Sequence, residues 1–259
     1  MPMRVLFVGD IVGGPGREVV LARVPGLRQE LSADYVVANA ENAAAGMGIT
    51  PNVCEALLGA ADILTLGNHT FRHKEIEVYL SSSERVVRPA NYHPAAPGRG
   101  WALTSREGQV PLAVLSLQGT VFMESMASPF TTFDSLIDEL RSRTPAVIVD
   151  FHAEATAEKA ALAYHADGRC SAVLGTHTHV QTADERILAG GTAFISDVGM
   201  TGPVDSIIGM DAGLVHRRFV LGLPTRFSVA AGAATLWGVL VDIDGATGSA
   251  TAIQRIRID

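Results

Sequence analysis

The stretch Ser171-Ala172-Val173-Leu174-Gly175-Thr176-His177-Thr178-His179 is a short apolar run that leads directly into two histidines. Short runs of β-branched and apolar residues are typical of buried strands in a parallel sheet. Residues i and i+2 of an extended segment point to the same side, so we expect the two imidazoles to face one site. The alternative interpretation is a polar loop with two exposed histidines.

Four other apolar runs end in the same way. Residues 4–9 lead into Asp10, residues 35–40 into Glu41-Asn42, residues 62–67 into Asn68-His69, and residues 146–151 into His152. Open α/β sheets bind ligands beyond the carboxyl ends of their strands. Each motif alone has an ordinary explanation as a turn, a cap or a loop. Together, the five strand ends predict a shared site for more than one metal ion.

Length and composition are typical of a globular α/β protein, and we expect one domain over residues 1–259. The chain is 47% hydrophobic and 18% charged, so it can bury a sizeable core, and disorder is not expected. The formal net charge of -7 argues against an extended nucleic-acid surface. A small phosphorylated substrate is still compatible with this charge, because bound metal ions can reverse the local sign of a site.

The sequence contains no targeting or membrane signal. Cys54 and Cys170 match no disulfide or metal-binding spacing. The first strand begins without a signal-peptide pattern, and no apolar run approaches the roughly 20 residues that span a bilayer. We therefore expect a cytoplasmic protein with no membrane partner. The sequence is compatible with a homo-oligomer but does not determine the oligomeric state.

Strand and helix signals alternate through most of the chain. Helices are expected over residues 17–31, 50–58, 73–80, 133–143 and 155–165, and strand pairs over residues 101–117 and 233–257. This order predicts a central mixed sheet, or two packed sheets, with helices outside. Gly13-Gly14-Pro15-Gly16 is expected to form a tight turn or, alternatively, to cradle a phosphate. Arg72 and Lys74 are expected at the solvated start of a helix.

The types of residue at the strand ends suit metal-assisted phosphoryl chemistry. Imidazole, amide oxygen and carboxylate together favour iron, manganese or zinc. When two ions lie roughly 3.5 Å apart, one carboxylate bridges them, and the pair activates a bridging water for in-line attack on phosphorus. A nearby imidazole can then protonate the leaving oxygen.

The motif series resembles that of the calcineurin-like metallophosphoesterases over roughly residues 3–202. The matching motifs are Gly9-Asp10, Gly67-Asn68-His69, His152 and Gly175-Thr176-His177-Thr178-His179. Two motifs depart from the usual pattern. Asp10-Ile11-Val12 lacks the histidine of the first block, and Ala40-Glu41-Asn42 replaces the Gly-Asp of the second.

Both departures are shared by the bacterial YmdB-like group, which is described as 2',3'-cyclic-nucleotide 2'-phosphodiesterases. Val8-Gly9-Asp10-Ile11-Val12-Gly13, Asn39-Ala40-Glu41-Asn42 and Asp197-Val198-Gly199-Met200-Thr201-Gly202 resemble this group closely. The resemblance implies a central β-sandwich flanked by helices, in four α/β/β/α layers.

The resemblance also implies roles for eight residues and a cofactor of two divalent or trivalent metal ions. Glu41 is the bridging carboxylate, Asp10, Asn42 and His179 complete one metal site, Asn68, His152 and His177 complete the other, and His69 is the general acid. Iron is the metal usually described for this group, although the ligand set does not exclude manganese or zinc. Asp150 is a further candidate for orienting a ligand, or a plain strand-end carboxylate.

The implied reaction is hydrolysis of a small phosphodiester. A hydroxide that bridges the metals would open 2',3'-cyclic nucleotides, such as 2',3'-cAMP, to 3'-nucleotides. Two alternatives stay open. The same site could hydrolyse phosphomonoesters or RNA-derived phosphodiesters, or the protein could be a regulatory nucleotide-binding module. The intact ligand set argues against the second alternative, because a pure binder has no need for a bridging hydroxide.

Overall fold

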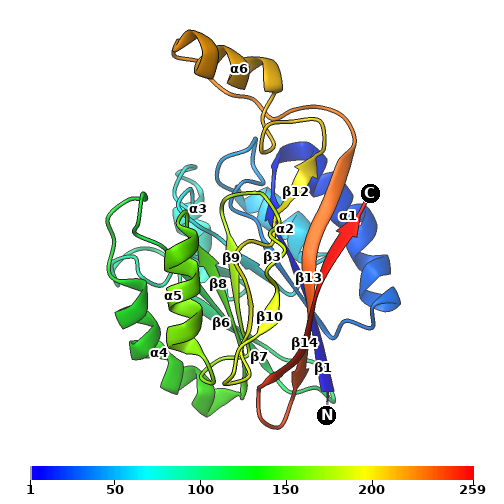
Figure 1. The fold of residues 1–259 in the computed structure, drawn as a ribbon, viewed down its shortest axis with the longest axis vertical. Coiled ribbons are helices and arrows are strands. Elements are labelled where there is room, and N and C mark those ends of the chain that lie inside the picture. Colours follow the sequence, from blue (N-terminus) through cyan, green and yellow to red (C-terminus); the bar gives the residue numbers. More distant parts are fainter. Residues whose placement is uncertain (1) are drawn as a thin grey trace.

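The computed structural model describes residues 2–259, whose strands form two sheets (Figure 1). The strands are β1 (Pro2–Val8), β2 (Asp10–Ile11), β3 (Tyr35–Asn39), β4 (Ile63–Thr65), β5 (Val86–Val87), β6 (Trp101–Thr104), β7 (Leu112–Gln118), β8 (Ala146–His152), β9 (Ala172–Thr176), β10 (Arg186–Ile187), β11 (Ala193–Ile195), β12 (Met200–Pro203), β13 (Ala234–Asp244) and β14 (Ala250–Ile258). The first sheet has the order β2-β12-β13-β1-β3-β4-β5, with β14 also paired to β13. The second sheet has the order β10-β11-β9-β8-β7-β6.

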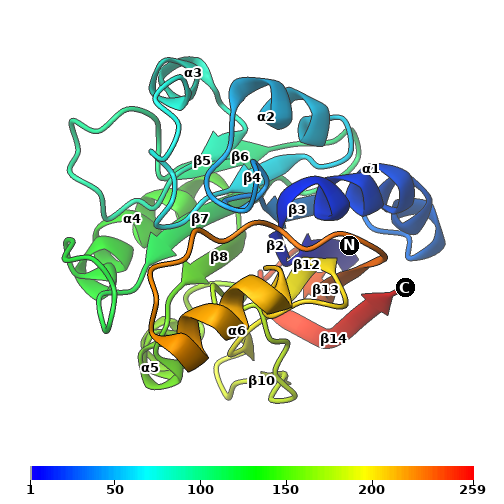
Figure 2. The ribbon, with the colours of Figure 1, turned by 90° about the horizontal axis from the view of Figure 1, so that it is seen from above.

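Helices cover the outer faces of both sheets. They are α1 (Gly13–Glu30), α2 (Pro51–Leu58), α3 (Ile76–Ser82), α4 (Pro129–Arg143), α5 (Thr156–Ala166) and α6 (Ala212–Leu221). The first three pack on the first sheet, and α4 and α5 pack on the second (Figure 2). This arrangement confirms the predicted four-layer α/β/β/α fold. Helix α6 instead projects from the body (Figure 1).

None of the helices within residues 2–259 combines the length and the apolar character needed to cross a bilayer.

The core strands alternate between two buried faces. In β1, Val5 and Phe7 lie in the layer between the sheets, whereas Leu6 and Val8 pack against the helices. Because both faces are covered, these strands appear in the sequence as continuous apolar runs. Burying each large apolar side chain contributes about 1.5–3 kcal/mol to stability.

The strands that lead into the predicted ligands run parallel. In the first sheet β1 pairs with β3 and β3 with β4, and in the second sheet β7 pairs with β8 and β8 with β9. Parallel strands end at the same edge of a sheet. The residues that follow these strands are therefore brought to one end of the sandwich.

The structure contains all of the predicted helices and both predicted strand pairs, with differences at their ends. Helix α1 begins at Gly13, so Gly13-Gly14-Pro15-Gly16 forms its first turn and is not a separate glycine turn. Helix α3 begins at Ile76, so Arg72 and Lys74 lie in the loop before it and not at a helix start. Helix α6 was not predicted.

Helix α1 passes very close to β12 at Gly16. A Cβ atom on Gly16 would lie 2.3 Å from the backbone oxygen of Thr201, which is too close for any side chain. Gly14 lies in the same helical turn but faces open space, since the nearest atom to a Cβ there is 3.9 Å away.

Replacing each of these two glycines by alanine is expected to have opposite effects on the stability of the protein. Gly16→Ala is expected to lower the free energy of unfolding by about 1–3 kcal/mol, because α1 must move away from β12. Gly14→Ala is expected to be neutral or to raise it by up to about 1 kcal/mol, because alanine favours the helix. Urea unfolding of both variants measures the difference. Equal changes in the free energy of unfolding for the two variants would contradict the close contact between Gly16 and Thr201.

Candidate metal centre

The residues predicted to form the site all lie at one end of the sandwich. They are Asp10 after β1, Glu41 and Asn42 after β3, Asn68 and His69 after β4, His152 as the last residue of β8, and His177 and His179 after β9. Asp10, Glu41 and His152 are fully buried, whereas the side chains of His69 and His177 are partly exposed. Both sheets therefore contribute to one polar cluster.

The first group of contacts surrounds the Nε2 atom of His152. This nitrogen lies 2.9 Å from Glu41 Oε1, 3.1 Å from Asn68 Oδ1 and 3.0 Å from His177 Nδ1. A ring nitrogen carries either one proton or one lone pair, so it cannot satisfy three neighbours at once. A cation placed among the four groups could accept a lone pair from each. The ligand atoms of Glu41, His152 and His177 lie within 4.8 Å of one another.

The second group contains Asp10, Asn42 and His179. His179 Nε2 lies 2.9 Å from Asn42 Nδ2 and 3.9 Å from Asp10 Oδ1. The amide oxygen of Asn42 points instead to His69 Nδ1, at 3.0 Å. Asn42 could ligate a cation beside His179 only after a rotation of its amide group that exchanges the oxygen and the nitrogen.

The donor set fits metal ions. Asp10 Oδ1 is buried and accepts no hydrogen bond within residues 2–259, and the buried Glu41 Oε1 has only its close contacts with the rings of His152 and His69. A buried carboxylate oxygen without a partner is costly, and a cation would remove that cost. Carboxylate, imidazole and amide oxygen together suit divalent transition metals. The group of contacts around His152 can therefore hold a metal ion.

The charges of the cluster depend on one another. Burial raises the pKa of Asp10 to about 6, against the opposing effect of the neighbouring histidines. Burial alone would also raise the pKa of Glu41, but the charge and hydrogen bond of His152 hold it well below the usual range. The pKa of His152 rises in turn to about 9, because the Glu41 charge outweighs burial. Burial and the charge of His152 lower the pKa of His177 to about 3. A bound cation would take the place of the proton on His152.

The buried carboxylate of Asp150 orients the His152 ring through the hydroxyl group of Thr176. Asp150 accepts hydrogen bonds from Thr65, from Asn39 Nδ2 at 2.9 Å and from Thr176 Oγ1 at 2.7 Å. Because the Thr176 hydroxyl gives its proton to Asp150, its oxygen accepts from His152 Nδ1, 2.9 Å away. This arrangement keeps the proton on Nδ1 and leaves the Nε2 lone pair for a ligand role.

The two histidines after β9 do not lie on an extended segment, so that expectation was wrong. His177 has a φ of 101° and His179 a φ of 67°, both in the left-handed region. His177 joins the first group of contacts, and His179 joins the second. Such backbone costs about 1–3 kcal/mol per residue and persists only where the surroundings hold it.

A buried ion pair holds this loop in place. Asp197 Oδ2 accepts hydrogen bonds from the backbone nitrogen of Thr178, at 3.0 Å, and from its hydroxyl, at 2.8 Å. The same oxygen lies 2.8 Å from Nζ of the buried Lys159. The residue between the two histidines is thus fixed by α5 and by the segment after β11.

Gly67 leaves room for the centre. A Cβ atom at this position would lie 2.2 Å from the His152 ring and 2.3 Å from Glu41 Oε2. No side chain fits there without moving both groups, which explains the glycine before Asn68.

A cavity of about 440 Å³ opens beside the cluster. His69, His177 and His179 line one part of it. The remaining wall is mainly apolar and comes largely from residues 207–227, which contribute Ile207, Ile208, Met210, Val215, Phe219 and Phe227. A cavity with polar groups at one end and an apolar wall suits a small molecule of mixed character.

Sequence reasoning missed several residues that support the site. Asn39 and Thr176 are polar residues in strands that are otherwise apolar, at positions that face the opposite sheet, and this signal was available. Lys159 lies on α5 at helical spacing from the buried Leu162 and Ala163, which was a second signal. The apolar wall gave no comparable signal.

Comparison with known proteins identifies close relatives. A sequence model described as "YmdB-like protein" matches residues 6–256. A Bacillus subtilis protein named 2',3'-cyclic-nucleotide 2'-phosphodiesterase is 49% identical, over 99% of this chain and 97% of the relative. The crystal structure of a hypothetical protein from Thermus thermophilus has 42% identity and a TM-score of 0.92, and covers 99% of both chains. That of a Mycoplasma pneumoniae protein described as a novel phosphatase has 33% identity and a TM-score of 0.92, and covers 100% of this chain and 94% of the other.

The buried ion pair between Lys159 and Asp197 is expected to contribute strongly to the stability of the protein. Lys159→Met leaves the Asp197 carboxylate buried without its cation, so the free energy of unfolding should fall by about 3–5 kcal/mol. Lys74→Met is the matched control, because Lys74 is exposed, and its effect should stay within about 0.5 kcal/mol. Chemical denaturation of both variants tests this. A loss of the same size in both would show that Lys159 does not compensate Asp197.

Proposed function

Because the chain belongs to the YmdB-like family, we propose that it is a metal-dependent phosphoric diester hydrolase that converts 2',3'-cyclic nucleotides, such as 2',3'-cAMP, to 3'-nucleotides. The observation that carries the proposal is the set of contacts around His152 Nε2, beside the buried Asp10 Oδ1, which accepts no hydrogen bond within residues 2–259. The name of the Bacillus subtilis relative supports the choice of substrate.

Two metal ions are part of the proposal. Glu41 would be shared between them, with Asp10, Asn42 and His179 on one side and Asn68, His152 and His177 on the other. Iron is the first choice, and manganese and zinc accept the same donors. When bound, the ions would supply positive charge for the phosphoryl oxygens and lower the pKa of the water that attacks phosphorus. The Asn42 amide would present its oxygen after the rotation described above.

His69 is proposed as the general acid. Its Nδ1 lies 3.1 Å from Glu41 Oε1, and its backbone nitrogen donates to Glu41 Oε2 at 3.0 Å. These contacts engage Nδ1 and fix the ring, so Nε2 is the nitrogen left for a substrate in the cavity. As water attacks phosphorus and the bond to the 2'-oxygen breaks, protonated His69 can donate its proton to that oxygen. The products are a 3'-phosphate and a free 2'-hydroxyl.

The apolar wall supports a nucleotide over a small phosphomonoester. Phe219 and Phe227 line the cavity. Aromatic side chains bind nucleobases by stacking, which contributes about 1–3 kcal/mol per base. The cavity thus offers a place for a nucleoside next to groups that suit a phosphoryl centre.

The proposal predicts activity that depends on metal. Protein loaded with manganese or iron should release 3'-AMP from 2',3'-cAMP, lose this activity to a chelator, and regain it when metal returns. Elemental analysis should find about two ions per chain, and Glu41→Gln should retain clearly fewer because the shared carboxylate is lost. Nucleotide binding without turnover would favour a regulatory module. Faster release of free phosphate from phosphomonoesters would favour a phosphomonoesterase.

The assignment of His69 predicts a separate effect. His69→Ala should lower kcat on 2',3'-cAMP by about 10²–10⁴-fold, because general-acid assistance to the leaving oxygen is lost. Metal content should stay unchanged, which distinguishes this role from that of a ligand. His93→Ala, outside the cavity, serves as the control. Undiminished turnover of the His69 variant would rule out His69 as the acid.

A further inference from the structure

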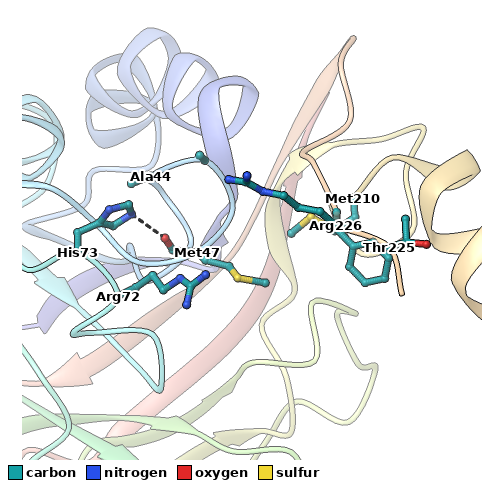
Figure 3. Close-up of a pocket in the computed structure, with 9 residues that line it drawn as sticks. Ala44, Met47, Arg72, His73, Met210, Thr225 and Arg226 are labelled. Atoms are coloured by element: carbon teal, nitrogen blue, oxygen red, sulfur yellow. Dashed lines mark hydrogen bonds between the residues drawn. The ribbon is translucent and has the colours of Figure 1, made fainter. Parts of the chain in front are cut away.

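A second pocket of about 360 Å³ adjoins the apolar cavity (Figure 3). The two share Met47, Met210 and Phe227 in their walls, so a ligand in one lies directly beside the other. The second pocket differs in charge: its lining includes Arg72 and Arg226 but no carboxylate. A cationic pocket next to the candidate metal centre is notable in a chain with a net charge of -7.

Both arginines are available to a ligand. The ion pairs within residues 2–259 that involve a guanidinium group use other arginines, so no carboxylate in that part of the chain lies within 4.0 Å of Arg72 or Arg226. The charge of each guanidinium is therefore not neutralised by a neighbouring acid.

Two separate segments bring the arginines together. Arg72 lies three residues after His69, and its backbone nitrogen donates to the His69 oxygen at 3.0 Å. Arg226 lies after α6 and comes from the opposite side, with Met47 between the two (Figure 3). His73 Nε2 lies 3.0 Å from the Met47 oxygen and fixes that wall. The pocket thus joins the loop of the proposed general acid to the segment that forms the apolar wall.

We infer that this pocket binds a second phosphate group of the substrate, the 5'-phosphate, while the cyclic phosphate lies at the metal centre. Guanidinium groups match phosphate oxygens in geometry and charge, and two that face one pocket favour a dianion. The nucleoside would lie along the shared apolar wall. This inference rests on the proposed function and narrows its substrate class to 2',3'-cyclic nucleotides that carry a 5'-phosphate.

The decisive experiment compares adenosine 2',3'-cyclic phosphate with and without a 5'-phosphate. The 5'-phosphate should raise kcat/KM about tenfold, mainly through a lower KM, as two charge-assisted contacts would. Arg72→Met and Arg226→Met should each bring the ratio of the two kcat/KM values toward one. Arg218→Met, on α6 and outside the pocket, is the matched control and should keep the ratio. A ratio near one in the unaltered protein would overturn the inference, and this comparison needs no variant.

Binding of products gives a readout that does not require turnover. Calorimetry should show tighter binding of adenosine 3',5'-bisphosphate than of 3'-AMP, with a difference that shrinks at high salt and in both arginine variants. If neither cyclic substrate is hydrolysed, the proposed function fails, and the calorimetric difference alone decides the inference. If both are hydrolysed equally and both products bind equally, the proposed function stands and the second phosphate site does not.

Discussion

The buried carboxylate of Asp150 joins the two sheets directly beneath the candidate metal centre. It receives hydrogen bonds from Asn39 and Thr65 in the first sheet and from Thr176 in the second. Burying a carboxylate is costly unless its oxygens are satisfied, so this interaction constrains how the sheets face each other. Glu41 follows β3 of the first sheet, and His152 is the last residue of β8 in the second sheet. The 2.9 Å contact between their side chains therefore depends on how the two sheets are aligned.

The positions of the ligand-type residues could be predicted because the fold is regular there. Strands buried on both faces give continuous apolar runs, and parallel strands end at one edge, so the residues after them had to meet. The two-residue period of β8 also places Asp150 and His152 on the same face, where Asp150 can support His152 from below. Local sequence signals are sufficient when the neighbours are other regular strands.

Other features depend on contacts that sequence patterns do not contain. The loop after β9 looked extended, yet His177 and His179 both adopt left-handed backbone that is held by Asp197 and Lys159, from other parts of the chain. Helix α6 has a single buried residue, Val215. Its other apolar residues, such as Phe219, are exposed or line the cavity, so no sheet lies beneath them.

The proposed chemistry and the proposed substrate choice would be carried by different parts of this molecule. Most of the ligand-type residues follow core strands and are held by buried hydrogen bonds, whereas the apolar wall and Arg226 belong to the segment around α6. That segment also contacts His179, whose Nδ1 lies 2.9 Å from the Ile208 oxygen. A few backbone hydrogen bonds join the two ends of this segment to each other. For example, the Asp211 nitrogen donates to the Ser228 oxygen, and the Ala230 nitrogen donates to the Gly209 oxygen. Changes in it can therefore reshape the cavity without moving Glu41 or His152, as is usual where loops on a rigid scaffold select the ligand. It follows that relatives with the same metal ligands need not share a substrate, and that the residues facing the cavity from this segment are the ones to compare when substrates differ.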